Sequence, residues 1–302
     1  MRLSWAQRWS VNRESVITSW QSLIKRKPGS EKHRASVVFL PKCADFVWTA
    51  WRLWRTTIGS MDGFKNRASR IAHFTAEVVA ETLWPTRCAL CDVAGAVLCD
   101  RCASKLPYLD WWRACRRCGS PFGFVQCDLC NPVSLARIGR ESLPFAGCAS
   151  AVLFDEDTGR LVRVFKDQGE QRLADTMAFA MARVIPPEWA FDAVTFVPAT
   201  LSAARYRGFD HAELVARRVA GLIDAPCVGA LARPKTRDQR ALTGAQRIAN
   251  LAGRFHALDR VVPSRVLLVD DVYTTGATLC AATDALLGVG CSDVYCLTFA
   301  RV

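Results

Sequence analysis

The chain has 302 residues, of which 51% are hydrophobic, and a formal net charge of +12. This length suggests about two domains, and this apolar content excludes a globally disordered chain. The charge is uneven, because residues 1–70 hold fourteen Lys/Arg and only four Asp/Glu, which leaves +2 for the rest of the chain. The overall basicity therefore does not indicate that the whole protein binds nucleic acid.

The basic leader, residues 1–70, also contains six of the ten tryptophans. Cationic side chains beside aromatic rings are typical of single-stranded nucleic acid binding or of an anionic membrane surface. The plainer interpretation is an unfolded extension, or a true start at Met61. Charged residues interrupt the apolar stretch 37–59, so we expect no transmembrane segment. A short helix is predicted over 71–85, where Pro85 ends it.

Residues 86–132 contain four Cys-x2-Cys pairs. Each pair places two thiolates on one tight turn, and two such turns complete a tetrahedral Zn²⁺ shell without an open position. The segment is too short to build an adequate hydrophobic core, so bound metal must supply its folding free energy. We therefore expect a double zinc ribbon with two structural Zn²⁺ ions. The predicted metal ligands are Cys88, Cys91, Cys99, Cys102, Cys115, Cys118, Cys127 and Cys130.

Two alternatives for the cysteine segment stay open. A site of four cysteines also suits an iron–sulfur cluster, and the pairs can combine in crossed rather than sequential order. A disulfide scaffold is disfavoured, because the chain is long and begins without a signal peptide. Clustered cysteines then indicate metal binding in a reducing cytoplasm.

Residues 145–302 alternate between predicted strands and helices. Short apolar strands separated by helices predict an α/β fold, a parallel sheet flanked by helices. Ligands of such sheets bind beyond the carboxyl ends of the strands. The expected strands cover 149–154, 193–197, 266–270 and 293–300, and the expected helices 161–166, 174–184, 212–222 and 276–287.

The segment 266–278, VLLVDDVYTTGAT, carries the chemistry. An apolar strand leads into Asp270 and Asp271 at its tip, and a turn rich in hydroxyls opens the next helix. The helix start and the hydroxyls suit a phosphate dianion, and the carboxylates suit two sugar hydroxyls. A capped helix or an acidic Mg²⁺ site are the alternatives; the full string favours ribose 5-phosphate. The predicted phosphate-binding residues are Thr274, Thr275, Gly276, Ala277 and Thr278.

This string resembles the phosphoribosyl pyrophosphate (PRPP) motif of type I phosphoribosyltransferases. The flanking segments resemble one branch, the ComF (GntX-like) family, which is associated with DNA uptake and use. The resemblance covers about 83–302 and includes the double zinc ribbon. It departs at Asp210 and His211, where the family usually has Asn-Gln. The similar segments are the K-x-x-G stretch at 165–169, the V-P…R-G-F loop at 197–198 and 205–209, and the Q-x-x-L…R-x-x-N…F segment at 239–255.

The resemblance implies a type I phosphoribosyltransferase fold and loss of Mg²⁺-pyrophosphate from PRPP. Asp270 and Asp271 would hold the ribose hydroxyls and Mg²⁺. The loop after Val197 and Pro198 would face the leaving pyrophosphate. We expect His211 at the surface or at a helix cap. The basic residues expected near the pyrophosphate are Arg205 and Arg207, with Lys235, Arg237 and Arg240 on a mobile flap.

The acceptor of the phosphoribosyl group is not specified by these motifs. The chain stops directly after the last predicted strand, so no C-terminal hood is expected over the site. The acceptor pocket is then expected from 154–169, from the flap or from the zinc module. Two functions follow: phosphoribosyl transfer to an unidentified acceptor, or a non-catalytic PRPP- or nucleotide-binding module. The second would handle single-stranded DNA with the DNA-uptake machinery during competence.

Overall fold

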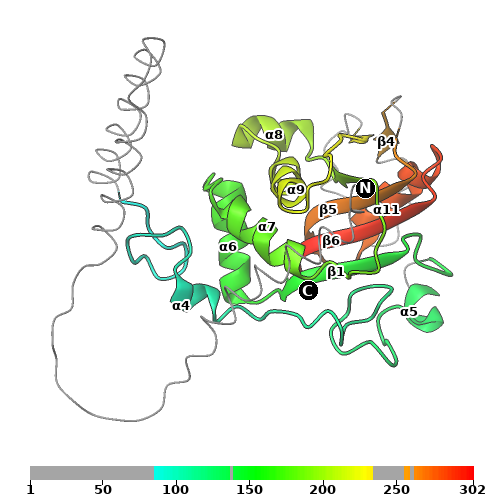
Figure 1. Ribbon diagram of the computed structural model, residues 1–302, viewed down its shortest axis with the longest axis horizontal. Helices are drawn as coiled ribbons and strands as arrows, with labels where there is room; N and C mark the ends of the chain where they lie inside the picture. Colours follow the sequence, from blue (N-terminus) through cyan, green and yellow to red (C-terminus); the bar gives the residue numbers. More distant parts are fainter. Residues whose placement is uncertain (1–84, 137–138, 234–254, 259–261) are drawn as a thin grey trace, which may run out of the picture. The chain divides into compact units, whose positions relative to one another are not determined.

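The computed structural model describes residues 85–136, 139–233, 255–258 and 262–302 (Figure 1). From Thr86 to Val302 the chain forms one compact unit. The leader and the helix expected before Pro85 lie outside the described residues. So do the flap residues Lys235, Arg237 and Arg240.

A four-stranded parallel sheet forms the centre of the unit. Its order is β1-β6-β5-β2, and every neighbouring pair is parallel. The strands are almost entirely buried because both faces of the sheet are covered. This confirms the α/β fold with a parallel sheet. The strands are β1 (Gly147–Leu153), β2 (Ala193–Phe196), β5 (Arg265–Tyr273) and β6 (Asp293–Arg301).

The two faces of the sheet have different covers. On one face, α7 packs on β1 and β6 and α9 packs on β2 and β5, and the two helices contact each other (Figure 1). Val266 and Leu268 of β5 belong to a buried cluster with residues of α11. Because side chains alternate along a strand, Leu267 and Val269 face the other layer. The helices that connect the strands are α6 (Glu156–Asp167), α7 (Leu173–Arg183), α8 (Leu201–Arg207), α9 (His211–Leu222) and α11 (Ala277–Leu287).

The second half of the cysteine segment completes the cover on the α11 side. Cys115, Cys118 and Cys130 lie in the same buried cluster as the α11 residues. At Gly119, whose φ is +73°, a Cβ would stand 2.7 Å from the carbonyl oxygen of Cys148 in β1. Only glycine lets the turn approach the strand this closely. Two short helices flank the cysteines, α4 (Asp100–Ala103) and α5 (Pro132–Ala136).

Two elements differ from the sequence expectation. The loop expected after Pro198 contains α8, because the Thr200 hydroxyl caps its first turn and Gly208, at φ +78°, ends it. The segment 234–254 is bounded by β3 (Leu231–Ala232) and β4 (His256–Ala257), which pair in antiparallel fashion. The residues that flank the expected flap on both sides are therefore joined by the pairing of β3 with β4.

The position of the two acids was also predicted wrongly. β5 continues to Tyr273, so that Asp270 and Asp271 lie within the strand and not at its tip. Both are buried, at 7% and 5% exposure. The longer pairing with β6 extends the strand, since the register reaches Tyr273 and Arg301. The acids therefore stand inside the sheet layer, where their charge is costly unless it is compensated.

Candidate ribose-phosphate site and cysteine groups

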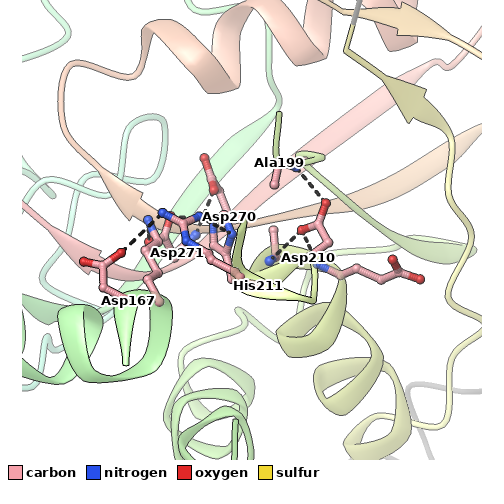
Figure 2. A network of polar contacts seen from close by, with 10 residues as sticks. Asp167, Ala199, Asp210, His211, Asp270 and Asp271 are labelled. Carbon is pink, nitrogen blue, oxygen red and sulfur yellow. Dashed lines mark hydrogen bonds and ion pairs between the residues drawn. The ribbon is translucent and has the colours of Figure 1, made fainter. Parts of the chain in front are cut away.

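Side chains from two helices, α6 and α9, contact the acidic pair (Figure 2). The Lys166 ammonium of α6 forms an ion pair with Asp271, and Nε2 of His211 in α9 lies 3.8 Å from Oδ1 of Asp271. The main-chain N–H of Asp271 donates to Oδ1 of Asp270 at 2.9 Å. Lys166 and His211 therefore join the two acids in the candidate site that the sequence predicted around Asp270 and Asp271.

The two carboxyl groups have opposite electrostatic environments. Burial and the charge of Asp271 raise the pKa of Asp270 well above its ordinary value. Burial also acts to raise the pKa of Asp271, but the Lys166 ammonium and His211 outweigh it and lower that pKa. Asp271 is thus held as a carboxylate, while Asp270 favours its neutral form when no cation is bound beside it.

His211 was expected at the surface or at a helix cap. It is buried at the first position of α9, directly after the Asp210 cap, so the expectation of a surface residue is wrong. Burial lowers its pKa to about 4, so that the ring is neutral at pH 7. Nη1 of Arg207 lies 3.4 Å from Nδ1 of His211. Because a guanidinium only donates, Nδ1 accepts and the ring proton is on Nε2, facing Asp271. Arg207 also lies 3.5 Å from Asp167 at the end of α6.

Asp210 fixes the position of His211. Its Oδ1 accepts from the main-chain N–H groups of Ala212 and Glu213 at the start of α9. Its Oδ2 accepts from the N–H of Ala199, in the loop after β2, at 2.7 Å (Figure 2). The Asp210 carboxylate therefore joins the start of α9 to the loop after β2. At Asp210 and His211, where the sequence departs from the ComF pattern, both side chains have polar partners.

The predicted phosphate loop follows the acids directly. Thr274 and Thr275 are exposed, and Gly276 precedes the first turn of α11 with φ +75°. A Cβ at Gly276 would stand 2.3 Å from the hydroxyl oxygen of Tyr273, so the position requires glycine. The N–H of Ala277 donates to the Thr275 hydroxyl at 3.4 Å. Exposed hydroxyls at the start of an eleven-residue helix are the kind of groups that suit an anion.

The carboxyl ends of β2 and β5 lie side by side, since these strands are parallel neighbours. The N–H of Val197 donates to Val269 at 2.9 Å, and Val197 and Pro198 are both buried. The connections after the two strands lead to opposite faces of the sheet, to α8 and α9 from β2 and to α11 from β5. Such a switch in direction is where ligands bind in open α/β sheets.

The structure brings most of the predicted site residues together. Arg207 joins the acids through His211, whereas Arg205 is exposed on α8 and has no polar contact to the acids in the described chain. Lys166 and His211 received no role from the sequence. Neither residue is near the acids in sequence. The feature that could have pointed to Lys166 was its position in the K-x-x-G stretch.

The eight cysteines of the Cys-x2-Cys pairs form two groups in sequential order. In each group the four sulfur atoms lie within 4.8 Å of one another. The Sγ atoms of Cys91 and Cys99 are 3.6 Å apart, and those of Cys118 and Cys127 are 3.5 Å apart. A Zn–S bond of about 2.3 Å sets about 3.8 Å between tetrahedral sulfurs. Every described cysteine is a free thiol, and both groups are compatible with structural zinc. The first group is Cys88, Cys91, Cys99 and Cys102, and the second is Cys115, Cys118, Cys127 and Cys130.

Comparison with known proteins agrees with this geometry. Residues 200–302 match the family model of the phosphoribosyl transferase domain. The chain therefore carries a domain of the phosphoribosyltransferase class, with the type I arrangement of parallel sheet and helices. Over 111 residues it is 32% identical to the competence protein ComFC of Streptococcus pneumoniae. The family match, this relative and the two preceding cysteine groups confirm the resemblance to the ComF family.

The matched segment covers 35% of this chain and 47% of ComFC, so the chain spans about half the length of that relative. Solved structures with similarity include an allosteric regulatory enzyme of purine biosynthesis, at 18% identity and a TM-score of 0.32, covering 42% of this chain and 25% of that one. An adenine phosphoribosyltransferase has 14% identity and a TM-score of 0.30, covering 51% and 80%. In the part of the chain that the structure describes, no helix has the length and apolar character to cross a membrane.

Proposed function

We propose that the chain binds PRPP, or a nucleotide containing ribose 5-phosphate, together with Mg²⁺, and that it transfers the phosphoribosyl group to an acceptor. The observation that supports this most is the continuous run of buried acids, open hydroxyl loop and helix start from β5 into α11. Asp270 and Asp271 would hold the ribose hydroxyls. The phosphate would be bound by Thr274–Thr278.

The acidic pair suits Mg²⁺ by its chemistry, because carboxylate oxygens are the hard ligands that this ion takes in proteins. The raised pKa of Asp270 is a further sign of fit, since a bound cation would favour the charged form that burial disfavours. When bound, Mg²⁺ would neutralise charge on the pyrophosphate. Lys166 and Arg207 would add positive charge from the other side of the acids.

In the transfer step, the bond between C1 of the ribose and the pyrophosphate oxygen breaks and the electron pair leaves with pyrophosphate. Positive charge develops on the ribose ring, and a lone pair of the acceptor forms the new bond to C1. The protein contributes positioning and electrostatic stabilisation in this step. The carboxylate of Asp271 would stabilise the positive charge that develops on the ribose ring, and the loop with Val197 and Pro198 would face the leaving pyrophosphate.

The test is pyrophosphate release from PRPP with Mg²⁺, measured with and without a panel of bases, amines and oligonucleotides. We expect release that depends on Mg²⁺ and rises with one acceptor class. Binding of PRPP without any release, with every acceptor, would reject the transferase and leave the binding function.

A second candidate function is a non-catalytic module that binds PRPP or a nucleotide and handles single-stranded DNA. Trp112, Phe122 and Phe124 near the second cysteine group are exposed. Arg113 lies 4.8 Å above the ring of Phe122, and Arg116 lies 5.0 Å above the ring of Phe124. Bases stack on exposed rings while arginines attract the phosphate backbone. One relative is named for competence. We propose DNA-uptake machinery as the partner of this module and a reducing cytoplasm as its compartment.

The DNA hypothesis is tested by fluorescence anisotropy with a labelled oligonucleotide. Replacing Phe122 and Phe124 with Ala should weaken binding at least about tenfold, since stacking contributes about 1–3 kcal/mol per base. The matched control is Phe154→Ala, an exposed ring at the end of β1 outside the cysteine segment. If the control and the double variant weaken oligonucleotide binding equally, the DNA does not bind at Phe122 and Phe124.

A further inference from the structure

Arg301, near the end of β6, is a buried cation in contact with the second cysteine group. The residue is 2% exposed. Its Nη1 donates to the carbonyl oxygen of Cys118, and its Nη2 lies 3.9 Å from the Sγ of the same cysteine. Its Nε has no hydrogen-bond partner, and no carboxylate among the described residues forms an ion pair with it. The guanidinium is therefore buried against the carbonyl and sulfur of Cys118 and the ring of Tyr273, without a carboxylate partner among the described residues.

A buried cation without a counter-charge strongly destabilises a fold. Four thiolates around one divalent metal carry a net charge of about −2. The second cysteine group with its metal therefore supplies the counter-charge that Arg301 lacks, and Arg301 in turn compensates the metal–thiolate charge. Groups in contact with metal ligands tune metal affinity in this manner. In the first cysteine group, no comparable buried arginine contacts a described sulfur.

The other face of Arg301 is directed to the phosphate loop. Its Cζ lies 4.0 Å from the ring centroid of Tyr273. Tyr273 is buried, and its hydroxyl end lies against Gly276, where a Cβ would come within 2.3 Å. The N–H of Val302 donates to the carbonyl of Tyr273 at 2.9 Å. A continuous line of contacts thus runs from Cys118 through Arg301 and Tyr273 to the residue that starts α11.

We propose that Arg301 is a positioning residue that couples metal in the second cysteine group to the phosphate loop of the ribose-phosphate site. With the metal in place, Arg301 is held between Cys118 and Tyr273, and Tyr273 supports Gly276 in the conformation that directs the start of α11 to the ligand. Loss of the metal leaves the guanidinium uncompensated, and Tyr273 and the loop lose their support. The identity of the ligand as a phosphate rests on the proposed function.

The metal side of the coupling is measured as zinc release from the full chain to a colorimetric chelator. Arg301→Met should speed release from one of two zinc ions about 10- to 100-fold, the usual effect of removing a group that supports metal ligands. Arg301→Lys keeps the charge and should restore much of the slow release. If Met and Lys variants release zinc at the wild-type rate, Arg301 only fills volume and the inference is overturned.

The loop side is measured by calorimetric titration with PRPP and Mg²⁺. The variant Cys127→Ser loosens the second group, and Cys91→Ser is its matched control in the first group, since both cysteines are partly buried. We expect the first variant to weaken PRPP binding at least about tenfold and the second to change it less than about twofold. By reciprocity, saturating PRPP should raise the equilibrium affinity of the second group for zinc by the same factor that zinc raises the affinity for PRPP, which a competitive chelator titration measures. Equal effects of the two variants would overturn the coupling.

A measurement without ligand distinguishes failure of the proposed PRPP binding from failure of the coupling through Arg301. Amide hydrogen exchange reports the start of α11, where the N–H of Cys280 donates to Gly276 at 2.8 Å. Faster exchange there in Arg301→Met, with wild-type exchange in the Lys variant, supports the coupling even if wild type binds no PRPP. Unchanged exchange in both variants overturns it, whether or not PRPP binds.

Discussion

At the residue scale, Asp270 and Asp271 are adjacent in sequence but differ in what surrounds them. The side chain of Asp271 has Lys166 and His211 within reach. Asp270 is buried next to a like charge and accepts only a main-chain N–H among its described partners. Two neighbouring acids whose pKa values are shifted in opposite directions are frequent at functional sites, and structural ion-pair networks produce such shifts as well.

Replacing both acids with Asn should weaken PRPP binding at least about tenfold. A hydrogen bond to a charged group contributes about 1.5–3 kcal/mol, and about 1.4 kcal/mol corresponds to one decade of affinity. Calorimetric titration with PRPP and Mg²⁺ measures the change. The control is Asp167→Asn, an exposed acid of the same network, which should bind within about threefold of wild type. Wild-type affinity in the double variant would mean that the site is elsewhere.

Asp270→Asn alone should make the metal-free protein more stable at pH 8. The pKa of Asp270 is raised in the folded state above its unfolded value of about 3.9. The stability that its proton provides is present below pH 4 and is lost as the pH rises through the folded pKa. Asn keeps the acceptor for the Asp271 N–H and has no proton to lose. Urea unfolding from pH 4 to pH 8 should show the advantage of the variant growing with pH; a constant difference would contradict this.

At the element scale, the start of α9 is the joint between the loop after β2 and the acidic pair. Asp210 caps the helix and holds Ala199, and the next residue, His211, faces Asp271. Phe209, just before the cap, packs against Phe165 of α6 with ring centroids 5.8 Å apart. The ring contact holds α6 beside the start of α9, from which Lys166 and His211 approach the two oxygens of the Asp271 carboxylate.

Asp210→Ala should lower the free energy of unfolding by about 0.5–2 kcal/mol, the usual cost of losing a helix N-cap. It should also weaken PRPP binding, because His211 loses its fixed position. Asp210→Asn is the informative control. Its amide oxygen can still accept from α9, but its NH₂ group cannot accept from Ala199, so we expect an intermediate loss in urea unfolding. Equal stability of the Ala variant and wild type would show that the cap is not needed.

At the scale of the whole molecule, the two cysteine groups have different surroundings. The second group lies in one buried cluster with α11 and the strands, whereas none of the cysteines of the first group belongs to that cluster. The second group therefore replaces part of the helical cover that a parallel sheet requires. A metal bound there would support the central fold as well as the turns of the group.

The purified protein should contain two zinc ions per chain by elemental analysis. Cys127→Ser should remove one ion and lower the melting temperature of the main transition, because the core loses part of its cover. Cys91→Ser should also remove one ion but shift the main transition less. One ion or none in wild type never exposed to chelator would reject the two-site interpretation, and iron in place of zinc would indicate a cluster.

The sequence by itself determined the features that are written in short, contiguous segments. The Cys-x2-Cys spacing predicted two groups of four sulfurs and left open which pairs combine. The run 266–278 predicted a strand, two acids, a hydroxyl turn and a helix. These predictions succeed because each turn or helix start depends on residues within a few positions of one another. The α/β fold followed from the same local alternation.

Only the tertiary structure decided what surrounds these segments. Asp270 and Asp271 became buried because pairing with β6 carries β5 past them to Tyr273, which no local pattern specifies. Lys166 and His211 reach Asp271 because the fold brings α6 and α9 to the same carboxylate, and Arg301 reaches Cys118 across 183 residues. The strand order sets such contacts, and it reflects burial summed over the whole sheet rather than the preference of any one segment.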